Sequence, residues 1–111
     1  MHKSHEISEE EWLLCKQYFN SSCAYCGLHE DDHYIIYAGA PKKTDLHKEH
    51  VDHDGSNKID NCVPSCQTCN SKKWAFTLDE WYTEENEHYS EERLNKILRW
   101  TEKDHKLAIV K

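Results

Sequence analysis

Two cysteine pairs with the same spacing constrain the fold of this 111-residue chain more than any other feature. Cys23 and Cys26 form the first pair, and Cys66 and Cys69 form the second. Two intervening residues let both sulfurs of a pair point at one ion, and four thiolates are a ligand set of tetrahedral structural zinc sites. The spacing therefore predicts one zinc ion that joins the pairs. Four cysteines leave no open coordination position, so this zinc should support folding and perform no chemistry.

The redox compartment decides between a metal site and disulfides. The N-terminal Met1-His2-Lys3-Ser4-His5-Glu6 lacks the apolar stretch of a signal peptide, and no later run approaches the roughly 18 apolar residues of a membrane span. We therefore expect a cytoplasmic protein without a membrane partner, where thiols stay reduced. A redox protein that uses its CxxC pairs is the rival reading, and it predicts thiol–disulfide exchange and no zinc. Cys15 and Cys62 lie outside the pairs and are expected to be small buried hydrophobic residues.

The composition supports a metal staple and limits the expected partners. Apolar residues make up 37% of the chain, below the roughly 45–50% usual for globular proteins, and so sparse a core favours a structural metal. The net charge of −7 opposes binding to nucleic acid by bulk electrostatics. A local basic face can still form in the middle of the chain, where the lysines are Lys42, Lys43, Lys48, Lys58, Lys72 and Lys73.

The residue patterns predict a single α+β domain over residues 1–111. Capping boxes at Ser8 and Thr77 and a start signal at Ser90 predict three helices, the first from about Glu9 to Phe19. Around the second cysteine pair, a helix is expected from Gln67 to about Trp74. Strands are expected at Leu46–Val51 and around Cys62-Val63, on either side of a turn at 54–57. The middle of residues 28–43, His33–Ala38, fits a short helix or a strand, and Gly39-Ala40-Pro41 ends it.

The segment between the cysteine pairs carries a more specific pattern. Glu49-His50 lies on the first predicted strand, Asn61 follows the turn, and Cys66-Gln67-Thr68-Cys69-Asn70-Ser71-Lys72-Lys73 lies on the helix. This arrangement resembles the signature of the HNH endonucleases, in which His50, Asn61 and Asn70 would occupy the three named positions. The nine-residue step from Asn61 to Asn70 also fits the family, as does the three-residue step to Lys73. Phe76 and Trp81-Tyr82 extend the likeness to small phage and bacterial members that have the same four cysteines.

The resemblance implies a ββα-metal core at about 44–76, stapled by a zinc ribbon, with flanking helices that include C-terminal ones at about 78–104. It also implies hydrolysis of phosphodiester bonds, more of DNA than of RNA, with the 3′ oxygen as leaving group. A neutral imidazole with a pKa near 6.5 suits proton removal from water, and a hard ion such as Mg²⁺ or Mn²⁺ suits the leaving oxyanion.

The family assigns a role to each residue. His50 would be the general base, and Glu49 and Asn70 would bind the catalytic metal. Asn61 would hold the loop so that His50 is oriented, and Lys72 and Lys73 would contact phosphate. The family usually has Asp at position 49, and in a regular strand Glu49 points away from the face of His50. With a net charge of −7, we expect weak intrinsic affinity for double-stranded DNA or a protein partner that supplies binding.

Several alternatives stand beside this reading. Asp52-His53 is a second acidic-histidine pair, similar to that of the endonuclease VII group, and in that register His53 is the base and Asp52 the metal ligand. The step to Asn61 is eleven residues from His50 and eight residues from His53. The loop of the family is commonly longer than either step, so His50 departs less from the family pattern. Without context, Glu-His is a solvated strand edge and Lys72-Lys73 a solvated helix face. A zinc-ribbon nucleic-acid-binding module without catalysis is the second functional hypothesis. The other histidines, including His29, His33 and His88, are expected at the surface.

Overall fold

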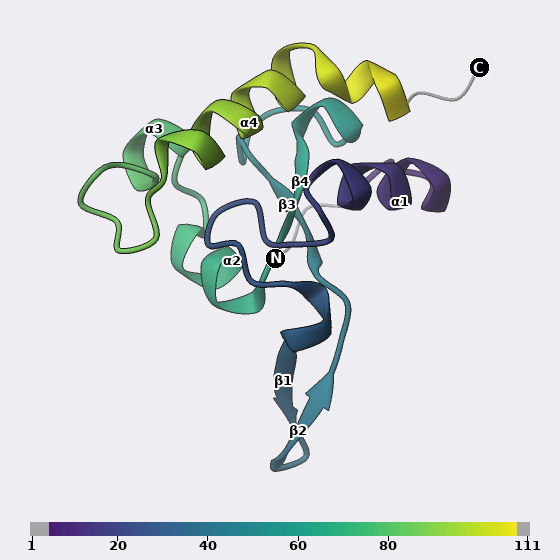
Figure 1. The fold of residues 1–111 in the computed structure, drawn as a ribbon, viewed down its shortest axis with the longest axis vertical. Coiled ribbons are helices and arrows are strands. Elements are labelled where there is room, and N and C mark those ends of the chain that lie inside the picture. The colour runs from purple at the N-terminus through teal and green to yellow at the C-terminus, as the bar shows by residue number, and fades with distance from the viewer. Residues whose placement is uncertain (1–4, 109–111) are drawn as a thin grey trace.

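A central ββα unit organises the chain in the computed structural model, which describes residues 5–108. Strand β3 (His47–His50) pairs antiparallel with β4 (Cys62–Ser65), with His47 opposite Ser65 and His50 opposite Cys62. Helix α2 (Gln67–Lys73) follows β4 directly and packs beside β3 (Figure 1). The predicted α+β class is therefore confirmed, with both strands and the helix within a residue or two of their expected positions.

Capped helices surround this unit. Helix α1 (Glu9–Tyr18) begins at the predicted capping box, where Ser8 Oγ accepts a hydrogen bond from the Glu11 amide at 3.1 Å. The same device at Thr77 starts α3 (Leu78–Trp81), and Ser90 caps α4 (Glu91–Glu102). Three short 3₁₀ turns complete the described elements: η1 (Glu30–Asp32), η2 (Ile59–Asn61) and η3 (Asp104–Ala108).

The hydrophobic core lies between β4 and the helices α1 and α4. Trp100 is almost fully buried, and its indole Nε1–H donates to the Cys62 carbonyl at 2.9 Å, which ties α4 to the strand. The ring of Tyr18 packs on Trp100 with centroids 4.8 Å apart. Cys15 and Cys62 are buried as predicted, and the Cys15 thiol donates to the Cys62 carbonyl.

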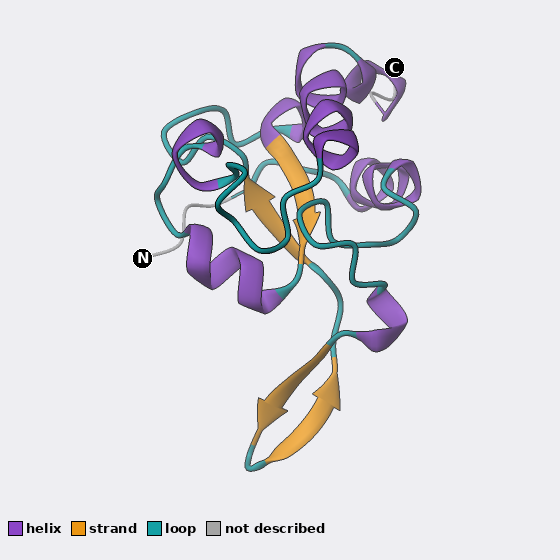
Figure 2. Ribbon diagram, turned by 60° about the vertical axis from the view of Figure 1, so that its left-hand side comes forward, coloured by secondary structure: helices purple, strands orange, loops and turns teal. Residues whose placement is uncertain are grey.

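The ambiguous segment before β3 forms a hairpin, which resolves it as strand. Strand β1 (Tyr34–Tyr37) pairs with β2 (Ala40–Lys43), and the two-residue turn between them has positive φ at Ala38 and Gly39. Positive φ at both turn residues is typical of the type I′ turn, whose twist matches that of paired strands. The hairpin projects away from the rest of the molecule (Figure 2).

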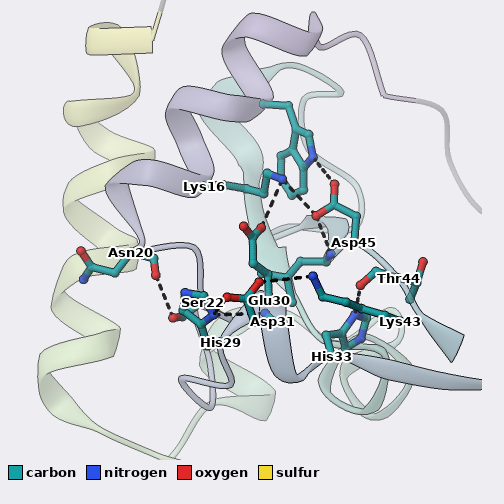
Figure 3. Close-up of polar contacts among 12 residues, drawn as sticks. Lys16, Asn20, Ser22, His29, Glu30, Asp31, His33, Lys43, Thr44 and Asp45 are labelled. Carbon is teal, nitrogen blue, oxygen red and sulfur yellow. Dashed lines mark hydrogen bonds and ion pairs between the residues drawn. The ribbon is translucent and has the colours of Figure 1, made fainter. Parts of the chain in front are cut away.

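His33 corrects one sequence expectation, because it is buried rather than at the surface. Its Nδ1 lies 3.0 Å from the Thr44 carbonyl oxygen, and its Nε2 accepts from the Gln67 amide at 3.0 Å. The ring thus joins the base of the hairpin to the start of α2. Figure 3 shows the contact between His33 and Thr44 beside the ion pairs of Lys16 and Lys43.

No helix in the described part of the chain is long and apolar enough to cross a membrane. The signal-peptide expectation concerned residues 1–6, of which residues 1–4 lie outside the described part of the chain.

Candidate metal centre and active site

The four predicted zinc ligands come together at one point. The sulfurs of Cys23, Cys26, Cys66 and Cys69 all lie within 4.8 Å of one another, and the Cys26 and Cys66 sulfurs are 3.7 Å apart. Zn–S bonds of about 2.3 Å in a tetrahedron place sulfurs about 3.8 Å apart, so this cluster fits a zinc ion.

The cysteine chemistry also suits a metal. Hydrogen bonds among the four sulfurs lower the pKa of the Cys23 thiol and raise that of Cys69, so one thiol of the cluster ionises more readily at the expense of its neighbours. All six cysteines are unbridged.

His50 lies at the end of β3, where its strand meets the loop that leads to β4. Its side chain is largely buried, with Nε2 3.0 Å from Asn57 Oδ1. The imidazole of His5 stacks on it, with ring centroids 4.1 Å apart and planes inclined by 26°. Burial, and next the neighbouring His50, lowers the pKa of His5 to about 4, so the covering ring is neutral near pH 7.

Asn61 braces that loop through three hydrogen bonds to its backbone. Asn61 Oδ1 accepts from the Asp52 amide at 2.9 Å, and Nδ2 donates to the carbonyls of Asp52 and Ser56 at 2.8 and 2.9 Å. The Val51 amide also donates to the Asn61 carbonyl at 3.0 Å. These bonds hold the backbone of the chain that follows His50.

Glu49 points to the opposite side of β3 from His50 and is buried in a polar cluster. Its carboxylate accepts a hydrogen bond from the Tyr25 hydroxyl, and Lys73 Nζ lies 3.2 Å from Glu49 Oε1. Lys73 is fully buried and also donates to the His50 carbonyl at 2.9 Å. Burial raises the pKa of Glu49 to about 7, although Lys73 and Tyr25 pull it down.

This placement departs from two sequence expectations. Lys73 was expected to contact phosphate, but its ammonium faces inward and donates to the Glu49 carboxylate and the His50 carbonyl. Glu49 was expected to bind a divalent ion, but its buried carboxylate is already paired with an ammonium.

The remaining predicted residues are more accessible. Asn70 is half-buried on α2 and Lys72 is exposed, 3.4 Å from Glu87 in a surface ion pair. In the alternative register, Asp52 is exposed and His53 half-buried on the loop. Asn70 carries an amide oxygen and Asp52 a carboxylate, and both are of the oxygen-donor type that Mg²⁺ and Mn²⁺ prefer.

Sequence reasoning missed three residues that contact the candidate site: His5, Tyr25 and Asn57. Tyr25 had a usable signal, because it lies between two zinc ligands and must share their buried surroundings. Asn57 sits in a turn cluster, where asparagine needs no other explanation, and His5 precedes the first helix by several residues. Neither carried a signal of its contact with His50.

Comparison with known proteins supports the geometry. The family model of the HNH endonucleases matches residues 23–76, from the first zinc-cluster cysteine to just beyond α2. A Bacillus subtilis (strain 168) protein, named SPbeta prophage-derived putative HNH endonuclease YoqL, is 50% identical over 99 residues. That alignment covers 89% of this chain but only 43% of YoqL, so the chain spans less than half of its relative's length. No solved structure matches the chain. Residues 23–76, which hold the ββα unit and the four-cysteine cluster, therefore belong to the HNH endonuclease family.

Proposed function

We propose that this chain is a metal-dependent endonuclease that hydrolyses phosphodiester bonds of DNA, with His50 as general base. The observation that carries the proposal is the position of His50 at the end of β3, in an HNH domain, beside a loop that Asn61 fixes by three hydrogen bonds. A base must be held in place relative to its substrate, because misplacement by about 1 Å can cost two orders of magnitude in rate.

The residues around His50 prepare it for proton transfer. A neutral imidazole takes a proton from the attacking water near pH 7. The contact between His50 Nε2 and Asn57 Oδ1 would hold the imidazole in one orientation. Lys73 holds the His50 carbonyl from the far side of the strand and would position the backbone of the base.

Asn70 would hold the divalent ion, Mg²⁺ or Mn²⁺, together with Glu49, whose carboxylate would have to leave the ion pair with Lys73. In the register with His53 as base, Asp52 would take the place of Glu49. When bound, such an ion supplies positive charge that stabilises the leaving 3′ oxygen, which leaves a 5′ phosphate on the product. The zinc ion in the cysteine cluster would take no part in this chemistry, because four thiolates fill its coordination sphere. Lys72, exposed on α2, would contact phosphate.

One observation favours a second function, a zinc-ribbon module that binds nucleic acid without cutting it. The Glu49–Lys73 ion pair neutralises, inside the protein, the acidic residue that precedes the base. In such a module the pair would be structural only, and His50 would have no substrate. A protein partner would then supply any catalysis.

A supercoiled-plasmid cleavage assay with Mg²⁺ or Mn²⁺ separates these functions. We expect wild-type protein to relax or linearise the plasmid and His50→Ala to lose at least two orders of magnitude in rate. His88→Ala, which removes an exposed histidine outside the site, serves as the matched control and should keep full activity.

Two results would contradict the proposal. Full activity of His50→Ala together with loss in His53→Ala would move the base to the second register. Intact, zinc-loaded wild-type protein that cuts nothing with either ion would favour the binding module.

A further inference from the structure

The β1–β2 hairpin exposes large apolar side chains that the core does not use. The exposed fractions are 55% for Tyr34, 73% for Ile36 and 63% for Tyr37. Isolated exposed apolar residues are ordinary, but several on one projecting element mark an interaction site. The hairpin is therefore a contact element that the catalytic proposal leaves unexplained.

The strand register divides these side chains between both faces of the ribbon. Tyr34 lies opposite Lys43 and Ile36 opposite Pro41, whereas Tyr37 lies opposite Ala40. Successive residues alternate between faces, so Tyr34 and Ile36 share one face and Tyr37 lies on the other. A ribbon that docks flat on a protein buries one face, while a ribbon inserted into a groove contacts a wall with each face.

The charge of the hairpin differs from that of the rest of the chain. Residues 34–43 contain two lysines and none of the 21 acidic residues, although the whole chain carries a net charge of −7. Lys42 Nζ lies 4.7 Å from the centroid of the Tyr37 ring, and Lys43 makes an exposed ion pair with Asp31 at 3.2 Å. Exposed pairs of this kind are weak and exchange readily for a phosphate.

The dimensions of the hairpin suit the major groove of B-form DNA. That groove is about 12 Å wide and 8.5 Å deep and admits a two-stranded ribbon. Four-residue strands at about 3.3 Å per residue give a ribbon of about 13 Å, long enough to reach the groove floor. The tip, Ala38-Gly39-Ala40, is narrow, and both lysines lie toward the base of the ribbon, on the side of the phosphate-lined rim.

The base of the ribbon is fixed to the body. Thr44 is hydrogen-bonded to His33, and the His33 ring also accepts a hydrogen bond from the Gln67 amide at the start of α2. Lys16 of α1 pairs with Glu30 at 3.3 Å and with Asp45 at 3.0 Å, one on each side of the hairpin (Figure 3). A ribbon held on both sides is a preorganised arm, which loses little freedom on binding.

We infer that the β1–β2 hairpin is a DNA-binding arm that enters the major groove of double-stranded DNA. Tyr37 and Lys42 contact one wall of the groove and its phosphates, and Tyr34, Ile36 and Lys43 contact the other. The inference rests on the proposed function for its substrate, but it concerns binding and not bond cleavage. It also supplies the local basic element through which an acidic chain can hold DNA.

The test measures binding without cleavage, in zinc-loaded protein that carries His50→Ala and without added Mg²⁺ or Mn²⁺. Fluorescence anisotropy of a labelled 20-base-pair duplex compares this parent with the same protein carrying Tyr37→Ser and Lys42→Ser. Lys103→Ser is the matched control, an exposed lysine that caps α4. Melting temperature and zinc content verify that each variant is folded, which we expect because the hairpin lies outside the core.

We expect the hairpin variant to bind the duplex at least ten-fold more weakly than the parent, with Lys103→Ser unchanged. The slope of log K against log salt should fall by about 0.9, the value of one phosphate contact. Duplex RNA should bind more weakly than DNA, because its major groove is too narrow for a ribbon.

Three results would overturn the inference. The hairpin variant binds the duplex as tightly as the parent, or the parent binds no DNA at low salt. The third is that the parent is a dimer and the hairpin substitutions convert it to a monomer. The last would assign the hairpin to contacts between copies of this chain. If the parent binds DNA through the hairpin but the wild type does not cut plasmid, the hairpin is a DNA-binding arm and only the nuclease proposal is rejected.

Discussion

Removing the ammonium of Lys73 tests the buried polar cluster that links β3 to α2. Lys73→Met keeps most of the aliphatic stem but leaves the Glu49 carboxylate buried without its cation, which lies 3.2 Å away in the wild type. Breaking a buried ion pair from one side costs about 3–5 kcal/mol, because the remaining charge is unsolvated. Lys72→Met is the matched control: its ammonium is exposed, and the change should cost less than about 0.5 kcal/mol.

The cost of Lys73→Met should also depend on pH. Burial raises the pKa of Glu49 from 4.5 to about 7, so its contribution to stability is fully present below pH 4.5 and is lost as the pH rises through 7. Without Lys73 the pKa of the Glu49 carboxyl rises further. At lower pH Glu49 is then protonated, and no unpaired charge is buried. The destabilisation should therefore be about 1 kcal/mol smaller at pH 6 than at pH 8.

Urea unfolding followed by tryptophan fluorescence, at pH 6 and pH 8, measures both effects. Adding Glu49→Gln to Lys73→Met should restore about 2 kcal/mol at pH 8, because a neutral amide needs no counter-charge. The reasoning is refuted if Lys73→Met costs no more than Lys72→Met, or if its cost is the same at both pH values.

Three further changes test the zinc staple, the loop and the hairpin anchor. Cys66→Ser should lower the melting temperature and the zinc content together, and an unchanged melt would count against the staple. Asn61→Ala removes three hydrogen bonds and should cost about 2–3 kcal/mol, with faster amide exchange at residues 52–57; exchange as slow as in the wild type would reject the brace. His33→Ala should lower the free energy of unfolding, measured with urea, by about 2–3 kcal/mol, whereas His88→Ala should lower it by less than about 0.5 kcal/mol. Equal losses would show that His33 does not anchor the hairpin.

The parts of the fold set by local chemistry were predictable from the sequence. Cysteine spacing predicted the cluster because two-residue gaps restrict where sulfurs can point, and the clustering is confirmed. Ser8 and Thr77 predicted helix starts because their side chains satisfy amides of the first turn, whatever the tertiary context. The hairpin was ambiguous because exposed apolar residues on both of its faces erase the alternation that identifies a strand.

The candidate site was less predictable because burial depends on long-range packing. The sequence does not distinguish the adjacent residues Lys72 and Lys73. On α2, however, Lys72 faces solvent and Lys73 faces the interior. The pattern did hold a clue: Cys69 must face the zinc, and Lys73, four residues later, shares its helix face. No comparable rule links His5 to His50, or His33 to Gln67, because their contacts join segments far apart in the chain.

The central claim, that water opens the phosphodiester bond with the 3′ oxygen as leaving group, is tested most directly by end analysis of DNA cut in ¹⁸O-labelled water. The account predicts nicks with 3′ hydroxyl ends that a DNA ligase reseals, and one ¹⁸O atom in each 5′ phosphate, all lost with His50→Ala. Products with a 3′ phosphate, or 5′ phosphates without the label, would contradict it.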